Sequence, residues 1–353
     1  MNPVLALARP EILDLKPYSH AAWQPSLTRL HANEAPWRPP GDTTAAGLNR
    51  YPEPQPQALV ARLAALYGVP AGMLLVGRGS DEAIDLLSRI YLRAGTDAIL
   101  QSPPTFGMYR VAAHIQGAGV VDVPLERERG WSLDPGRLLA AWRPSMKIVY
   151  LCSPNNPTAN AFELGAIEAV CTALDGKAIV AIDEAYIEWS GRPSLAAWLE
   201  RFSTLAVLRT LSKAHALAGA RIGALLARPE LIEVARRVIP PYSLAQPTIE
   251  AALRALEPDA LAAARTRLDS LLAERDYLRS RLERSPLVAK VWPSDTNFLL
   301  VDSADADRFL RASRAGGTLV RDLRANAALP SALGISVGTR AENDALIDSL
   351  EAA

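Results

Sequence analysis

The segment Ala178-Ile-Val-Ala-Ile-Asp-Glu-Ala-Tyr186 decides the fold, because a short apolar run ends abruptly in acidic groups and a phenol. Two further apolar runs lie about 30 residues away on either side, Lys147–Cys152 before it and Thr204–Leu208 after it. Each run is rich in Val, Ile or Leu and is separated from the next by a helical segment, as buried parallel strands joined by helical crossovers are. We therefore expect an α/β fold whose larger part is a mostly parallel sheet flanked by helices.

The pattern extends in both directions from these three strands. Helices are predicted at Gln57–Tyr67, Glu82–Tyr91 and Pro229–Val238, and strands at Met73–Val76 and Ile222–Ala227. After Pro240 and Pro241, a long charged helix at about Asp259–Arg284 leads to shorter strands at Asn297–Val301, Thr318–Val320 and Gly334–Val337. We predict an N-terminal arm over residues 1–50 with one strand at Leu27–His31, a large domain over 51–240 and a smaller α/β domain over 241–353.

Composition excludes several classes of protein. Of the 353 residues, 49% are hydrophobic and 22% are charged, with 38 Lys and Arg against 38 Asp and Glu. This zero net charge favours a soluble protein that binds neither nucleic acid nor a membrane surface. The N-terminus lacks a signal-peptide pattern, so a cytoplasmic location is expected. Cys152, Cys171 and four histidines show no metal-ligand spacing, and we predict no metal site.

Each of the three central runs is followed by polar residues. They are Ser153-Pro-Asn-Asn-Pro-Thr, Asp183-Glu-Ala-Tyr and Arg209-Thr-Leu-Ser-Lys. In open parallel sheets, ligands bind beyond the carboxyl ends of the strands. A strand-terminal Asp or Asn alone is often a helix cap. Three such ends together place an amide, a carboxylate, a phenol and a lysine around one cavity, which favours a ligand site.

With these motifs the chain resembles the fold-type I enzymes that depend on pyridoxal phosphate (PLP), and more closely the histidinol-phosphate aminotransferase family. The resemblance covers nearly the whole chain. Besides the three strand ends and Ser212-Lys-Ala through Arg221, it rests on Leu30-His-Ala-Asn-Glu, Asn49-Arg-Tyr-Pro-Glu-Pro-Gln-Pro, Gly77-Arg-Gly-Ser-Asp-Glu and Pro104-Thr-Phe-Gly-Met-Tyr. It implies a homodimer, with the arm packing on the small domain and on the partner, and amino transfer from L-histidinol phosphate to 2-oxoglutarate in histidine biosynthesis.

The resemblance also implies roles for residues around the cofactor. Lys213 corresponds to the lysine that forms the Schiff base and then carries a proton, which suits a side-chain amine. Asp183 corresponds to the partner of the pyridine nitrogen, and Asn156 and Tyr186 to donors to the ring oxygen. Tyr109 corresponds to an aromatic residue stacked on the ring.

The cofactor phosphate requires cations or backbone amides. Arg221 corresponds to the arginine that holds it, and Thr210 and Ser212 to nearby hydroxyl groups. Gly79, Ser80 and Asp81 stand where a strand turns into a helix, which favours anion binding. Tyr51 corresponds to a tyrosine that the neighbouring subunit supplies to the phosphate.

The substrate is less firmly indicated. Tyr18, Asn33 and Arg321 correspond to substrate-binding positions, but Gly334 stands where the family has a second arginine, and Ala159 replaces a usual glycine. Arg340, six residues further on, is a candidate substitute. Three alternatives therefore stay open: an aminotransferase of aromatic or other amino acids, an enzyme like threonine-phosphate decarboxylase, and a PLP-binding protein without activity.

Overall fold

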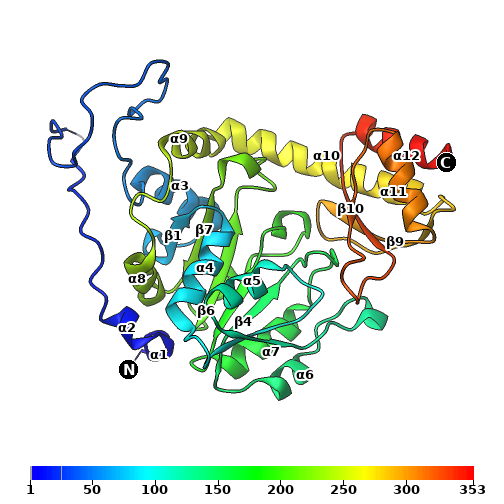
Figure 1. The fold of residues 1–353 in the computed structure, drawn as a ribbon, viewed down its shortest axis with the longest axis horizontal. Helices are drawn as coiled ribbons and strands as arrows, with labels where there is room; N and C mark the ends of the chain where they lie inside the picture. The colour runs from blue at the N-terminus through cyan, green and yellow to red at the C-terminus, as the bar shows by residue number, and fades with distance from the viewer. Residues whose placement is uncertain (1, 25) are drawn as a thin grey trace.

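The computed structural model describes residues 2–24 and 26–353, and two β-sheets organise them (Figure 1). The larger sheet has seven strands in the order β1-β7-β6-β5-β4-β2-β3. Its strands are β1 (Leu74–Gly77), β2 (Ala98–Gln101), β3 (Gly119–Asp122), β4 (Met146–Cys152), β5 (Ile179–Asp183), β6 (Leu205–Thr210) and β7 (Gly223–Ala227). Strands β3, β2, β4, β5 and β6 run parallel to one another, whereas β7 is antiparallel to both β6 and β1. The predicted α/β fold is confirmed.

The three predicted central strands are adjacent, as β4, β5 and β6. Cys152 pairs with Asp183, and Asp183 pairs with Leu208, so the carboxyl ends of the three strands meet at one edge. Side chains along β5 alternate between two apolar clusters, with Ile179 in one and Val180 in the other. Strands β2 and β3 were not predicted from the sequence.

Helices cover both faces of this sheet. They are α3 (Gln57–Tyr67), α4 (Ser80–Tyr91), α5 (Met108–Ile115), α6 (Pro135–Ala141), α7 (Leu164–Leu174) and α8 (Pro229–Val238). Helices α3 and α8 have the predicted bounds. Helix α9 (Gln246–Ala255) packs against α3, and its Ile249 belongs to the core of the large sheet.

The C-terminal part has its own antiparallel sheet, in the order β10-β11-β9-β8. The strands are β8 (Val288–Val291), β9 (Phe298–Ser303), β10 (Arg321–Asp322) and β11 (Ala332–Ser336), with helices α11 (Ala306–Ala315) and α12 (Arg340–Glu351). The long α10 (Pro258–Leu282) runs from α9 to this sheet (Figure 1), and its Leu278 joins Phe309 and Leu346 in a separate core. The predicted strand Thr318–Val320 is wrong, because the two-residue strand that pairs with β11 begins only at Arg321.

The N-terminal segment begins with two short helices, α1 (Pro3–Leu7) and α2 (Pro10–Leu13). Both contact α8, and Val4 is fully buried there, so this part packs beside the large sheet rather than on the small one. Between α2 and α3 the described residues form neither helix nor strand, and the predicted strand Leu27–His31 is wrong because it has no pairing partner. This stretch lies along the outside of the molecule (Figure 1). No helix in the described residues is long and apolar enough to span a bilayer.

Candidate functional site

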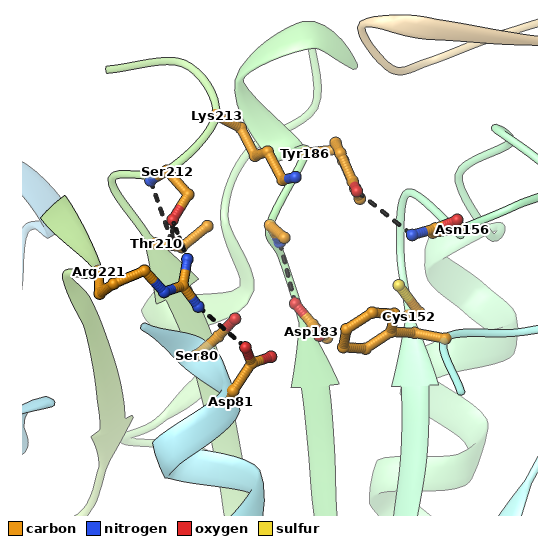
Figure 2. Close-up of a pocket in the computed structure, with 12 residues that line it drawn as sticks. Ser80, Asp81, Cys152, Asn156, Asp183, Tyr186, Thr210, Ser212, Lys213 and Arg221 are labelled. Carbon is orange, nitrogen blue, oxygen red and sulfur yellow. Dashed lines mark hydrogen bonds and ion pairs between the residues drawn. The ribbon is translucent and has the colours of Figure 1, made fainter. Parts of the chain in front are cut away.

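A cavity of about 140 Å³ opens at the carboxyl ends of β4, β5 and β6 (Figure 2). Nine of the predicted site residues line it: Ser80, Asp81, Asn156, Asp183, Tyr186, Thr210, Ser212, Lys213 and Arg221. Phe106, Cys152 and Ala185 complete the lining, and the sequence reasoning did not select them. Residues from the ends of three strands and from the start of α4 thus converge on one volume, as the polar strand ends predicted.

Asp183 lies at the floor of the cavity and is only 2% exposed. The hydroxyl of Tyr109 donates to its Oδ2 at 2.8 Å, and the backbone N–H of Ala185 donates to its Oδ1 at 3.1 Å. Burial raises the pKa of the Asp183 carboxyl to about 6, although both hydrogen bonds oppose that rise. A cation against this carboxylate would offset the cost of its burial.

Lys213 follows the end of β6, and its side chain points into the space above Asp183 (Figure 2). Its Nζ lies 5.6 Å from the centre of the Tyr186 ring. On the same side of the cavity, the Asn156 amide nitrogen donates to the Tyr186 hydroxyl at 3.4 Å. An amine and a pair of hydrogen-bonding groups therefore face the same space above the carboxylate.

The loop that carries Asn156 is held by its neighbour Asn155, which is fully buried. The Asn155 amide nitrogen donates to the Pro104 carbonyl at 2.8 Å and to the Thr158 hydroxyl at 2.7 Å. Its amide oxygen accepts from the Thr105 hydroxyl at 2.8 Å. The sequence reasoning missed this supporting residue, and its only signal was a second asparagine before Pro157.

Ala159, in the same loop, has φ +66°. This left-handed backbone explains why a glycine is usual at that position.

The opposite side of the cavity is a cradle for an anion (Figure 2). The Arg221 guanidinium lies 3.0 Å from Asp81 and 3.4 Å from the Ser212 hydroxyl, which in turn accepts from Thr210 at 2.9 Å. Helix α4 begins at Ser80, and its N-cap residue, Gly79, has no side chain to cap the first backbone N–H groups. These groups together offer charge and hydrogen-bond donors to a phosphate.

Glycines make this cradle possible. Gly79 has φ +79°, and a Cβ there would lie 3.0 Å from the Arg221 guanidinium. A Cβ on Gly223 would lie 2.3 Å from the carbonyl carbon of Gly79 and 2.4 Å from the amide nitrogen of Ser80. Strand β7 therefore approaches the start of α4 as closely as backbone atoms allow.

Tyr109 does not stand where the resemblance implied. Its ring is fully buried below the cavity, stacked on Tyr150 at 4.4 Å between ring centres, and only its hydroxyl reaches the site, at Asp183. Phe106, which precedes α5, lines the cavity together with Tyr186, whereas Tyr109 is not among its described lining. The two residues differ because Tyr109 lies on the inward face of α5, toward the core cluster, whereas Phe106 lies in the connection before it.

A second cavity of about 580 Å³ adjoins the first and shares Phe106, Asn156 and Tyr186 with it. Arg321 is the charged residue among its described lining, and Gly334 lies opposite Arg321 in the pairing of β10 with β11. The remaining lining includes the apolar side chains of Met108, Val111, Phe298, Leu323 and Leu329. The prediction that Arg321 borders the site is therefore compatible with its position.

Three other predicted residues line neither cavity. Tyr51 and Asn33 border a separate surface hollow, and the Tyr51 ring stacks on Tyr242 at 4.6 Å. Tyr18 is 66% exposed and packs edge-on against His20. Within one chain these residues do not meet Lys213.

Arg340 does not take the place of the arginine that is absent at Gly334. Its guanidinium lies 2.9 Å from the Glu274 carboxylate and 3.6 Å from the centre of the Tyr277 ring. It does not line the cavity that contains Arg321.

These residues fit pyridoxal phosphate. A buried carboxylate with a raised pKa suits a protonated ring nitrogen, and Lys213 offers an amine for the aldehyde. The cradle of Arg221, Ser212 and the start of α4 suits the phosphate.

Comparison with known proteins agrees with this geometry. Residues 32–350 match the family model described as aminotransferase class I and II. A histidinol-phosphate aminotransferase from Stenotrophomonas maltophilia is 47% identical over 100% of this chain and 98% of that protein, and one from Xanthomonas oryzae pv. oryzae is 46% identical over 99% and 97%. The crystal structure of histidinol-phosphate aminotransferase from Sinorhizobium meliloti in complex with pyridoxal-5'-phosphate is 26% identical, covers 85% of this chain and 82% of that chain, and has a TM-score of 0.76.

This similarity extends over the whole chain, including the segments that line the Lys213 cavity, and favours an enzyme over a PLP-binding protein without activity. The chain belongs to the class I and II aminotransferase family, in the branch that includes the histidinol-phosphate aminotransferases, and it is a pyridoxal-phosphate-dependent aminotransferase.

Proposed function

We propose that this enzyme transfers the amino group of L-histidinol phosphate to 2-oxoglutarate, as a step of histidine biosynthesis in the cytoplasm. The similarity to relatives of that name, at 45–47% identity, carries the proposal. The placement of Arg321 supports the proposal, because this cation lines the cavity that adjoins the Lys213 cavity and suits a phosphate on the amino donor.

The proposed roles follow from the position of each group. Bound pyridoxal phosphate supplies an electron sink for the substrate carbon. Lys213 would hold the cofactor through its side-chain amine and would move a proton at the substrate carbon. Asp183 would keep the ring nitrogen protonated, and Asn156 and Tyr186 would donate hydrogen bonds to the ring oxygen.

The phosphate of the cofactor is assigned to the anion cradle. Arg221 supplies the charge, Ser80, Thr210 and Ser212 supply hydroxyl groups, and the N-terminus of α4 after Gly79 supplies backbone N–H groups. Asp81 competes with the phosphate for Arg221 through an ion pair whose side chains are 50% and 42% exposed. Exposed pairs of this kind are worth about 0–1 kcal/mol, so a phosphate displaces Asp81 readily.

Because Gly334 stands in place of an arginine, one alternative is an amino donor whose anionic group is bound by a single arginine, Arg321. The backbone does not require glycine here, because a Cβ would meet Leu323 and Arg321 at 3.4–3.9 Å, which is ordinary contact. A Gly334→Arg variant therefore adds a cation beside Arg321. For a phosphorylated amino donor it should lower KM about tenfold, equivalent to about 1.4 kcal/mol.

The test is a panel of amino donors offered to the purified, cofactor-loaded enzyme, with 2-oxoglutarate as acceptor. We expect histidinol phosphate to have the highest kcat/KM and Lys213→Ala to abolish turnover. A higher kcat/KM for aromatic amino acids would favour the alternative. Carbon dioxide release would indicate a decarboxylase, and absence of turnover by the folded, loaded enzyme with histidinol phosphate would refute the proposal.

We further propose that the enzyme is a homodimer and that Tyr51 serves the cavity of the partner subunit. The stretch between α2 and α3 exposes large apolar side chains, which a monomer rarely leaves in water: Tyr18, Leu27, Leu30, Trp37, Leu48 and Tyr51. The backbone of Tyr51 is fixed by Glu34, whose carboxylate accepts from its N–H at 2.7 Å and from Arg29 and Arg50 at 2.6 and 3.0 Å. Tyr18 and Asn33 belong to the same stretch, and we assign them to the substrate side of that shared site.

Mixed dimers separate the two arrangements. If Tyr51 acts across the interface, a Lys213→Ala subunit paired with a Tyr51→Ala subunit contains one site with both residues intact. Refolding the two variants together should then restore up to about a quarter of wild-type activity under random pairing, because half of the dimers are mixed and each has one intact site. If the two variants show only the sum of their separate activities, Tyr51 does not act in trans.

For the organisation of the chain, we keep the proposal of an arm over residues 1–50, a large domain over 51–240 and a small domain over 241–353. The separate core around Leu278 and Phe309 supports a distinct C-terminal unit. Helix α9, near the start of the small domain in this division, packs on α3 of the large domain.

A further inference from the structure

Arg127 joins the large sheet to the C-terminal sheet at a place away from the cofactor cavity. It lies in the short helix η2 (Arg127–Arg129), after β3. The guanidinium carbon lies 5.1 Å from the centre of the Trp131 ring and 5.4 Å from that of Trp292, so the cation contacts an indole from each part of the molecule. Such contacts with Trp are the strongest of the cation–π type.

The same guanidinium is paired with a buried carboxylate. Arg127 donates to Asp302 Oδ2 at 2.8 Å, and the Trp292 indole N–H donates to the same oxygen at 2.8 Å. The side chain of Asp302 is 8% exposed and that of Arg127 is 33% exposed. Removing the cation would leave the Asp302 charge buried beside neutral donors only, the Trp292 indole and the Ser331 hydroxyl, which lies 3.4 Å from Oδ1; leaving a buried charge without a counter-charge is costly.

Arg127 also holds the segment that joins β10 to β11. It donates to the Ala328 carbonyl at 3.2 Å. Leu323, Asn326 and Leu329 of this segment line the cavity that contains Arg321 and Gly334. Arg127 thus contacts the same segment that forms part of the wall of the proposed donor cavity.

We propose that Arg127 is a positioning residue for the amino donor. With Trp131, Trp292 and Asp302 it forms a clamp that fixes segment 323–331, and so sets the distance of this wall from Arg321 and the cofactor site. The identity of the amino donor rests on the proposed function, whereas the effect of Arg127 on the rigidity of segment 323–331 does not. The clamp touches none of the residues assigned to the cofactor, so its loss acts on donor binding and not on cofactor binding.

The test compares wild type, Arg127→Met and Arg129→Met. Methionine keeps an unbranched apolar chain between the indoles and removes the charge. Arg129 is a matched control, because it lies two residues away, is 76% exposed and, among the described residues, has its ion pair with Glu126 at 3.4 Å. Hydrogen exchange in peptides covering residues 323–331 is the first readout, since the Asn326 and Leu329 amides donate within the segment at 3.0 and 2.8 Å.

We expect exchange in segment 323–331 to be about tenfold faster in Arg127→Met, with exchange in β4–β6 and cofactor affinity unchanged. KM for the amino donor should rise about tenfold while kcat stays within about twofold, and Arg129→Met should match wild type. The donor is histidinol phosphate or, if wild type does not use it, L-glutamate in the reverse half of the exchange. Asp302→Asn, which removes the charge of the other partner, should shift exchange in the same direction.

Unchanged exchange in both folded variants would overturn the clamp. Faster exchange with an unchanged KM would overturn the positioning role. If wild type fails to use histidinol phosphate while exchange and glutamate KM respond as expected, the proposed substrate fails and the clamp stands.

Discussion

Tyr109→Phe should raise the pKa of Asp183 from below pH 7 to about pH 7 or above. The variant removes one hydroxyl, the one that donates to Asp183 Oδ2 at 2.8 Å, and leaves the stacked ring in place. A hydrogen bond to a charged group contributes about 1.5–3 kcal/mol, and about 1.4 kcal/mol corresponds to one pKa unit. Because burial already raises the pKa of Asp183 to about 6, the variant should bring it to roughly 7–8.

The consequence is a change in how cofactor binding depends on pH. A neutral Asp183 cannot hold a proton on the ring nitrogen by charge, so affinity should fall below the new pKa. At pH 7 the ionised fraction of Asp183 falls by about two- to tenfold for a pKa of roughly 7–8, and we expect pyridoxal phosphate to bind more weakly by that factor. The assay is the dissociation constant of the cofactor between pH 5 and 9, with infrared detection of the protonated carboxyl in the apoprotein and Asp183→Asn to identify its band.

Tyr150→Phe is the matched control. Tyr150 is as deeply buried and stacks on Tyr109, but its hydroxyl lies 3.4 Å from the Ile84 carbonyl and does not bond Asp183. An apparent pKa that stays in place in Tyr109→Phe, or that moves equally in Tyr150→Phe, would refute the reasoning.

Three further outcomes are expected. Asn155→Ala leaves the buried Pro104 carbonyl and Thr105 hydroxyl without their partner, and should lower the free energy of unfolding by about 2–4 kcal/mol in urea titration, with Thr172→Ala as a surface reference. Gly223→Ala forces the backbone at Gly79 away and should cost more than about 2 kcal/mol and weaken cofactor binding, whereas Gly219→Ala, with open space around it, should do neither. In the apoprotein the raised pKa of Asp183 means that its protonated form stabilises the folded state. This stabilisation is fully present below about pH 4 and is lost as the pH rises through about 6. In Asp183→Asn the free energy of unfolding should therefore depend less on pH between about 4 and 6.

The sequence predicted the centre of the molecule well because the relevant signals there are local. A run of four or five apolar residues that ends in a polar group identifies a buried strand and its ligand-binding end without knowledge of any partner. This is why β4, β5 and β6, with Asn156, Asp183 and Lys213 at their ends, were placed correctly. The antiparallel direction of β7 has no such local signal, since direction depends on which neighbours a strand joins.

The errors concern features that pairing or packing decides. Thr318–Val320 has strand-like residues, but Leu319 is 79% exposed, and pairing with β11 begins at Arg321. In Thr-Phe-Gly-Met-Tyr, either aromatic residue is a plausible cavity lining, and only the placement of α5 turns Tyr109 inward and leaves Phe106 at the cavity. Contacts between distant segments, such as Arg127 with Asp302, leave no trace in the local pattern.

The charges of the site explain why a neutral chain can hold a strongly anionic cofactor. On the proposed roles, Asp183 would face a cationic ring nitrogen. Its described hydrogen-bond donors, the Tyr109 hydroxyl and the Ala185 N–H, are neutral, and burial raises its pKa. The cofactor phosphate would bind Arg221. The present partner of Arg221, Asp81, is about half exposed, so breaking this ion pair costs little free energy. The negative charge of Asp81 also raises the pKa of Asp183. If the phosphate displaces Asp81, the pKa of Asp183 would then depend on the charges of the ring nitrogen and of the phosphate. Binding at the two ends of the cofactor is therefore coupled, and an Asp81→Asn change should lower the apparent pKa of Asp183 in the apoprotein while it frees Arg221 for the phosphate.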